Sequence, residues 1–252
     1  IGALAFEDAP VKELILPDSV TAIADGAFYA CKFLEKIHLG NSLVSLGEGA
    51  FADCFALAEA ILPATLQTMG TQVFSGCKAL TLLAVEEGCE AFSSAGNCII
   101  DANGVLVAGC STSVIPADGS VLAIAPYAFS FATGLTEVSI PEGVTEIGEG
   151  AFENTGLTTL FIPDTVTKVG KHILHGTKLV SLYCGSASQP VDWHIKWNFG
   201  LQIPVIWGYD NTCAHGETRH EALDPTCTAE GSYESVVYCS DCGTELSRET
   251  VT

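Results

Sequence analysis

The sequence contains few basic residues and no long apolar run. Its 252 residues include 10 Lys and Arg against 30 Asp and Glu, which gives a formal net charge of −20. Nucleic acids and anionic membrane surfaces are bound through clustered Lys and Arg, so this composition argues against both partners. We interpret the excess of acid as serving solubility. The sequence also lacks the roughly 18 consecutive apolar residues that a membrane-spanning helix requires.

Motifs of common enzymes are absent as well. None of the patterns G-x-S-x-G, H-E-x-x-H, Walker A or G-x-G-x-x-G occurs. His172 and His175 are three residues apart instead of the four of a helical metal pair, and no acidic third ligand is obvious. We interpret them as surface histidines. The sequence therefore predicts a protein that is not an enzyme.

An initiator Met and a signal peptide are also missing from the sequence. The first residues correspond to the second half of a repeat described below, so we expect a monomeric fragment of a larger protein. What is present is apolar: 48% of the residues are hydrophobic and 16% are charged. A chain of this composition can bury a core, which excludes wholesale disorder.

Aromatic residues recur at a nearly constant interval. Phe28, Phe51 and Phe74 lie 23 residues apart, and Phe129 and Phe152 repeat this spacing. Eleven residues before Phe28, Phe51, Phe74 and Phe152 stands a Pro or Gly, and a short apolar segment of the form L-x-x-L-x-L precedes that residue. Self-similarity at this period is the signature of a repeat array.

The spacing within each repeat predicts one short strand per coil. The last two apolar residues of L-x-x-L-x-L share one face of a strand, and Pro marks the point where the strand ends. A single coil has too little core of its own, so successive coils stack and pair their strands in parallel. The predicted strands are centred near Leu14–Leu16, Ile37–Leu39, Ala60–Leu62, Leu83–Val85, Val138–Ile140, Leu160–Ile162 and Leu182–Cys184.

At this point the sequence resembles the BspA-type leucine-rich repeats of bacterial surface proteins. The segment LTEVSIPEGVTEIGEGAF, from Leu135 to Phe152, matches their pattern nearly letter for letter. The resemblance extends from residue 1 to about residue 190. It implies a β-rich, right-handed leucine-rich-repeat solenoid with coils of about 23 residues, secreted or displayed on a bacterial surface. It also implies binding of a protein or host extracellular ligand and no catalytic residues.

The solenoid is expected over residues 1–185, with an irregular insertion near residues 86–126. Within the insertion, the segment from Ile99 to Val107 reads as a hairpin, because Asn103-Gly104 suits a tight turn with positive φ. Val114-Ile115-Pro116 then restarts the coil. The insertion is either a functional protrusion or a divergent coil that still stacks on its neighbours.

Residues 186–210 hold all three tryptophans, Trp193, Trp197 and Trp207. The end of a solenoid exposes an apolar coil that needs a cap, and large aromatic residues suit that role. We predict a Trp-rich capping segment. The alternative is an aromatic platform that binds carbohydrate, because three Trp so close together are unusual.

Three cysteines form a ladder through successive coils. Cys31, Cys54 and Cys77 each lie three residues after the aromatic of their coil. The family resemblance and their expected burial both favour free thiols packed as small apolar groups. Stacked Cα atoms are close enough for a disulfide by distance alone, but side chains at equivalent positions point the same way.

We expect residues 211–252 to form a small Cys/His module of zinc-ribbon-like character. His215, Cys227, Cys239 and Cys242 are the predicted ligands of one structural zinc ion, and Cys213 competes with them. The turn of C-x-x-C-G aims two thiolates at one point, and four protein ligands leave no position for a catalytic water. Alternatives are a disulfide such as Cys213 to Cys227, or free thiols. A tail of about 40 residues has too small a core to fold easily without a metal or a disulfide.

The partner-binding surface is predicted on the outward face of the strands. The residue between the last two core positions of each strand points away from the interior. This column contains the predicted contact residues Ile15, His38, Ile61, Phe161 and Tyr183, with Ala84 and Ser139 between them. Contiguous apolar stripes mark interaction sites, and aromatic residues dominate binding hot spots.

Three functions follow from these features. The first is a non-enzymatic binding or adhesion scaffold at the cell surface. The second is an architectural spacer in a larger surface protein, for which a wholly polar strand face would speak. The third is a carbohydrate-binding accessory protein that uses the Trp cluster.

Overall fold

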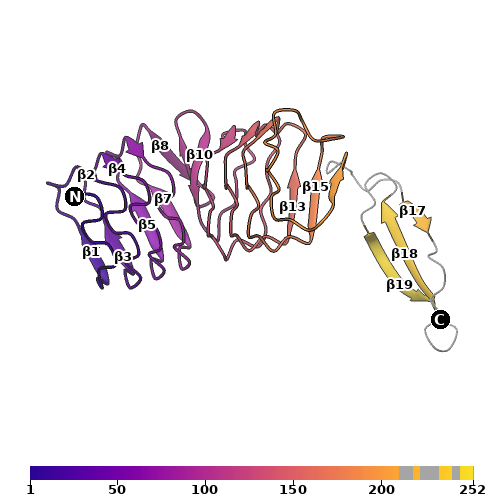
Figure 1. The fold of residues 1–252 in the computed structure, drawn as a ribbon, viewed down its shortest axis with the longest axis horizontal. Coiled ribbons are helices and arrows are strands. Elements are labelled where there is room, and N and C mark those ends of the chain that lie inside the picture. Colours follow the sequence, from indigo (N-terminus) through magenta and orange to yellow (C-terminus); the bar gives the residue numbers. More distant parts are fainter. Residues whose placement is uncertain (210–217, 222–232, 240–244, 252) are drawn as a thin grey trace.

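The computed structural model describes residues 1–209 in full and the backbone of three further strands between residues 218 and 251. The first 209 residues form a solenoid of stacked coils (Figure 1). A regular coil has three sides: a strand that bears the predicted pattern, a second strand of two residues, and a tight double turn that carries the aromatic residue. In the described residues no helix is long and apolar enough to cross a membrane.

The first side of the coils carries parallel strands. Its strands are β1 (Glu13–Ile15), β3 (Lys36–His38), β5 (Glu59–Leu62), β7 (Leu82–Val85), β13 (Thr159–Ile162), β15 (Ser181–Cys184) and β16 (Val205–Trp207). Pairing is parallel between β1 and β3, between β5 and β7, and along β13, β15 and β16. All but one of the predicted strands are therefore confirmed.

The strand predicted at Val138–Ile140 is wrong, because this segment forms no strand. One main-chain hydrogen bond still ties the neighbourhood of this segment to the next coil, where the N–H of Thr158 donates to the carbonyl oxygen of Thr136 over 3.4 Å. A single bond of this kind does not make a ladder.

The second side is a narrower parallel sheet. Its strands are β2 (Ala22–Ile23), β4 (Ser45–Leu46), β6 (Thr68–Met69), β11 (Ala123–Ile124), β12 (Glu146–Ile147) and β14 (Lys168–Val169). β2, β4 and β6 pair in that order, and β11, β12 and β14 do the same after the insertion. Each of these strands ends at or next to the apolar residue that lies six positions after the Pro or Gly of its repeat, such as Ile23 after Pro17 and Ile147 after Pro141.

The third side stacks the aromatic residues. The rings of Phe28 and Phe51 lie parallel with centroids 5.3 Å apart, and Phe129 and Phe152 repeat this distance. Main-chain hydrogen bonds join the turns of successive coils. The N–H of Phe28 donates to the carbonyl oxygen of Ala50, and the N–H of Phe129 donates to the carbonyl oxygen of Ala151, each over 2.9 Å. Phe51 and Phe152 are fully buried, which confirms the prediction that the aromatic fills the coil.

Two residues in each turn have a left-handed backbone. They stand two positions before and two positions after the aromatic residue, as at Gly26 and Ala30 on either side of Phe28. Glycine adopts this conformation without strain, whereas Ala30 and its non-glycine equivalents do so at some energetic expense. The tight double turn is what lets the chain enter and leave the core within five residues.

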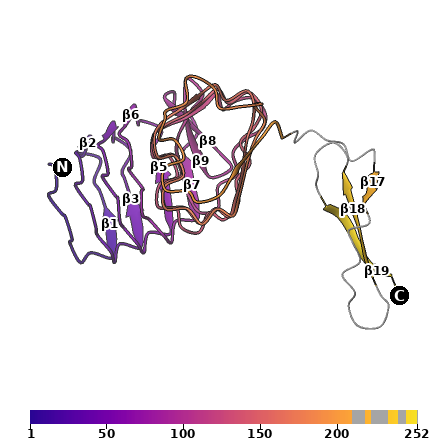
Figure 2. The ribbon, with the colours of Figure 1, turned by 45° about the vertical axis from the view of Figure 1, so that its right-hand side comes forward.

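The predicted hairpin is confirmed. It lies where the first coils meet the later ones, which Figure 2 shows nearly end-on. Its strands are β8 (Phe92–Ala95), β9 (Cys98–Asp101) and β10 (Val105–Gly109), all antiparallel to their neighbours within the insertion. On β9, Ile99 belongs to the core of the first coils, whereas Cys98 and Ile100 belong to the core of the later ones. β10 then pairs in parallel with β11, so the insertion continues the second sheet.

After residue 209 the structure gives three antiparallel strands in the order β17 (Thr218–Glu221), β18 (Tyr233–Cys239) and β19 (Glu245–Val251). Cys239 is the last residue of β18. Of the predicted zinc ligands, Cys213, His215, Cys227 and Cys242 lie outside the described residues, as does the side chain of Cys239.

Candidate functional site

The outward column of side chains predicted from the sequence exists in the structure. Ile15 stands beside His38 across β1 and β3, and Phe161 stands beside Tyr183 across β13 and β15. Ile15 is 69% exposed and Ile61 47%, so the face presents apolar side chains to solvent.

At the C-terminal end of this face three aromatic rings come together. Tyr209 lies 4.5 Å from Tyr183 and 5.9 Å from Phe161, measured between ring centroids. Tyr209 follows β16, where its N–H donates to the carbonyl oxygen of Cys184. Sequence analysis missed Tyr209, because it lies beyond the last strand and outside the repeat register. The cluster Phe161, Tyr183 and Tyr209, hereafter the aromatic cluster, is half-buried.

A depression of about 530 Å³ borders the aromatic cluster. It lies where the strand at Val138–Ile140 is missing, and Phe161 forms one of its walls. Its lining residues are Ser113, Val114, Glu137, Val138, Ser139, Thr158, Thr159, Leu160 and Phe161. The interrupted ladder thus turns a flat sheet into a concave surface with both apolar and hydroxyl groups.

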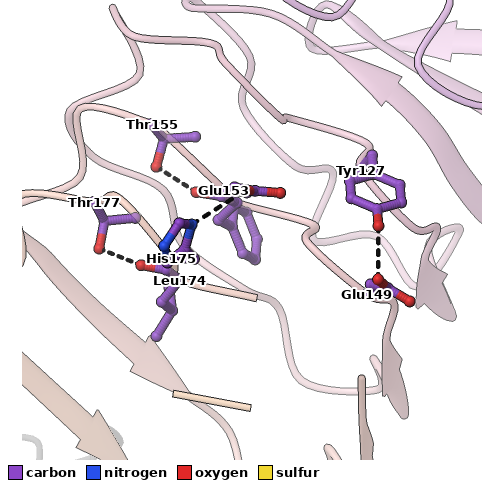
Figure 3. Close-up of polar contacts among 8 residues, drawn as sticks. Tyr127, Glu149, Glu153, Thr155, Leu174, His175 and Thr177 are labelled. Carbon is purple, nitrogen blue, oxygen red and sulfur yellow. Dashed lines mark hydrogen bonds and ion pairs between the residues drawn. The ribbon is translucent and has the colours of Figure 1, made fainter. Parts of the chain in front are cut away.

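The turn side carries a ladder of polar contacts instead (Figure 3). The hydroxyl of Tyr127 donates to Glu149 Oε1 over 2.7 Å, and Lys171 Nζ reaches the same oxygen at 3.0 Å. The hydrogen bond from Tyr127 holds the pKa of Glu149 below its ordinary value. Burial and the bond to Glu149 raise the pKa of Tyr127 to about 12. These contacts join three successive coils.

The two histidines flagged in the sequence lie on this same side. His175 Nδ1 is 3.1 Å from Glu153 Oε1, and the ring of Phe199 packs 5.2 Å from that of His172. Within residues 1–209 no group of three or more His, Cys, Asp or Glu side chains is arranged to hold a metal ion. The pair occupies surface positions, as expected from its spacing.

Residues 1–98 and 97–181 match the BspA type leucine rich repeat region in 6 copies. The chain belongs to this family. The structure of the pneumococcal vaccine antigen PcpA is similar, with a TM-score of 0.62 and 26% identity over 73% of this chain and 53% of that one. A leucine-rich repeat protein from Bacteroides ovatus gives a TM-score of 0.53 and 23% identity over 82% of this chain and 58% of its own.

This BspA-type chain therefore spans little more than half the length of those two solved structures. A search of curated protein sequences finds no match to it. The family accounts for the solenoid and for its repeat register. The binding partner is a separate matter, because repeat scaffolds of one fold carry different surfaces.

The three tryptophans complete the BspA-type array as a last coil. Trp193 and Trp197 are buried with centroids 4.7 Å apart, and Trp207 packs against both. Trp193 Nε1 donates to the carbonyl oxygen of Val166 over 3.1 Å. Trp197 lies 23 residues after Leu174 and is buried like the repeat aromatics, and its carbonyl oxygen accepts from the N–H of Ile173. Their burial supports the cap and removes Trp193 and Trp197 from a carbohydrate-binding platform.

The cysteine ladder binds the coils through its thiols. The Sγ atoms of Cys31, Cys54 and Cys77 donate to the carbonyl oxygens of the aromatic residue one coil earlier, over 3.1 to 3.3 Å. Burial raises the pKa of the Cys31 thiol to about 11, and it raises the pKa of the Cys77 thiol well above its ordinary value. The thiols of Cys31 and Cys77 are therefore protonated and unreactive at neutral pH. All three buried cysteines serve as apolar packing groups with one weak donor.

Proposed function

We propose that the protein is a non-enzymatic binding scaffold of a bacterial cell surface that recognises a protein ligand with the outward face of its first sheet. The observation that carries the proposal is the aromatic cluster beside the 530 Å³ depression. Half-exposed aromatic rings next to a concave wall are typical of interface hot spots. The similarity to a pneumococcal vaccine antigen supports placement at the cell surface or in the secreted fraction.

The face also has the mixed chemistry that protein interfaces use. Ile15 and Ile61 expose apolar area, while Thr158 and Thr159 offer hydroxyl groups at the depression. Interfaces combine a desolvated apolar centre with a polar rim. A face of this composition favours the binding scaffold over the spacer, for which a uniformly polar surface would be expected.

The experiment uses the whole chain against an array of purified host extracellular-matrix proteins and glycans. For each protein bound, affinity is compared with that of the double variant Phe161→Ser with Tyr183→Ser. Loss of an aromatic hot spot weakens binding by about 2 kcal/mol or more, close to thirtyfold. Val180→Ser is the matched control, because Val180 is exposed but lies before β15 and outside the column.

Unchanged affinity of a folded double variant would contradict the proposal and move the site to the hairpin around Asn103. An array in which nothing binds would favour the spacer function. Binding to glycans alone, with intact affinity after both substitutions, would favour a carbohydrate-binding accessory protein.

A further inference from the structure

The first sheet is interrupted a second time, between β3 and β5. Strand pairing joins β1 to β3 and β5 to β7, but in the described residues no ladder joins β3 to β5. In a parallel sheet, alternate residues direct their N–H and C=O groups to each side of a strand. The groups that β3 and β5 direct toward each other therefore have no ladder partner here.

A depression of about 420 Å³ lies at this break. Its lining residues are Leu16, Asp18, Ile37, His38, Leu39, Gly40, Asn41, Glu59, Ile61, Pro63 and Glu86. Ile61 forms an exposed apolar wall, and Ile15 stands exposed on the same face. The depression thus adjoins apolar surface and contains main-chain groups that still have hydrogen-bonding capacity.

The charge of the lining has one sign. Asp18, Glu59 and Glu86 contribute carboxylates, and no Lys or Arg belongs to the lining. Asp18 accepts the N–H of Asn41 over 2.8 Å, and Glu86 accepts that of Ala64 over 3.2 Å, so both carboxylates are held at the rim. The basic side chain on β3, Lys36, stands next to the depression without lining it.

We propose that this depression, hereafter the acidic pocket, receives a Lys or Arg side chain from an extended segment of the protein ligand, flanked by apolar side chains that contact Ile15 and Ile61. The inference rests on the proposed function and names a chemical class for the partner. Charge complementarity selects the occupant: carboxylates and carbonyl oxygens accept hydrogen bonds from cationic donors, and Arg presents five N–H groups for them.

The wider field of the protein acts in the same direction. No Lys or Arg occurs between Lys78 and Lys168, and the formal net charge of the chain is −20. A field of one sign accelerates encounter with an oppositely charged segment and disfavours partners of like charge. The same negative field repels an acidic segment at this face, so the face is expected to distinguish basic ligand segments from acidic ones.

The test compares two synthetic peptides with the isotope-labelled whole chain. One is acetyl-Gly-Ser-Ile-Ser-Arg-Ser-Ile-Ser-Gly-amide, and the other has citrulline, an uncharged isostere, in place of Arg. Both Ile and the central residue share one face of the extended peptide. The Arg peptide is expected to shift the amide signals of His38, Asn41 and Ile61, and the citrulline peptide to bind roughly threefold or more weakly, as exposed ion pairs require.

Two variants locate the effect. Glu59→Gln with Glu86→Gln keeps side-chain size and an acceptor oxygen but removes two charges, so affinity for the Arg peptide is expected to fall to that of the citrulline peptide. Glu142→Gln, in the turn after Pro141, is the matched control and is expected to change nothing. Raising NaCl from 50 to 300 mM is expected to weaken only the Arg peptide, because salt screens exposed charges.

Equal binding of the two peptides, shifts centred away from the acidic pocket, or no shift at millimolar peptide would overturn the inference. Phe161→Ser with Tyr183→Ser separates it from the proposed function. That double variant is expected to bind the Arg peptide normally, so loss of partner binding with intact peptide binding would still support the acidic pocket.

Discussion

The hydroxyl of Tyr127 donates a hydrogen bond of 2.7 Å to Glu149 in the next coil, although Tyr127 has the left-handed φ of 59° that favours glycine. The bond to a carboxylate compensates for the strain of that backbone. Removing it with Tyr127→Phe is expected to lower the free energy of unfolding by about 1–2 kcal/mol at pH 7. Urea denaturation measures the change.

The same bond predicts a response to alkali. The pKa of Tyr127 is raised from its ordinary value of 10.0 to about 12. A group whose folded pKa is raised stabilises the fold fully below its unfolded pKa, and that contribution is lost as the pH rises from 10 to about 12. We expect the stability of the wild type to fall more steeply than that of Tyr127→Phe over this window in urea titrations. Parallel curves for the two proteins would refute the assignment.

The stacked aromatic residues are expected to dominate stability. Phe51 is fully buried between Phe28 and Phe74, with ring centroids 5.3 and 6.0 Å away. Phe51→Ala leaves a cavity in the core and is expected to cost about 3–5 kcal/mol. Thermal or urea unfolding provides the measurement. Phe33→Ala is the matched control, since Phe33 is 60% exposed and should change stability by less than about 1 kcal/mol.

Gly109 is required where the hairpin rejoins the coils. A Cβ atom at this position would overlap the ring of Phe129, and the N–H of Gly109 bonds to Ala128 over 2.8 Å. Gly109→Ala is expected to destabilise the fold by about 1–3 kcal/mol through overpacking. If the ring is the cause, the same substitution in a Phe129→Leu background should cost less, and a double-mutant cycle measures this coupling. Gly2→Ala, with open space around it, is the neutral control.

Zinc in the C-terminal module stays a prediction from the sequence. Elemental analysis of the whole chain is expected to find one zinc ion per molecule, lost in Cys242→Ser and in His215→Ala. Cys184→Ser is the control, because Cys184 is buried in the solenoid with a pKa raised to about 12. A metal-free chain in which mass spectrometry finds a Cys213–Cys227 disulfide would show that the other alternative is correct.

The fold followed from the sequence wherever a residue's role is decided within its own coil. The interval between Phe28 and Phe51 is enough to place the core, because burial repeats with the coil. Val138–Ile140 carries the same apolar pattern as the true strands, yet it forms no ladder with the coil on either side. Whether a segment becomes a strand depends on the segment that it pairs with as well as on its own residues. The repeat pattern describes only the segment itself.

The site was predictable to the same degree. The outward column was found by alternation, so Ile15, Ile61, Phe161 and Tyr183 were placed on the correct face. The depressions were not, since each arises where a ladder fails to form. Tyr209 was missed because its contact with Tyr183 depends on how the chain leaves β16 and has no periodic signal.

The hairpin strand β9 packs Ile99 into the core of the first coils and packs Cys98 and Ile100 into the core of the later coils. It is therefore a partition that separates the two cores and covers the end of each one. Whole coils can be gained or lost on one side without altering the packing on the other. Relatives with different numbers of repeats are then expected to keep such a partition while the arms on either side vary in reach. The acidic pocket and the aromatic cluster, on opposite sides of it, would thereby be spaced by the number of coils.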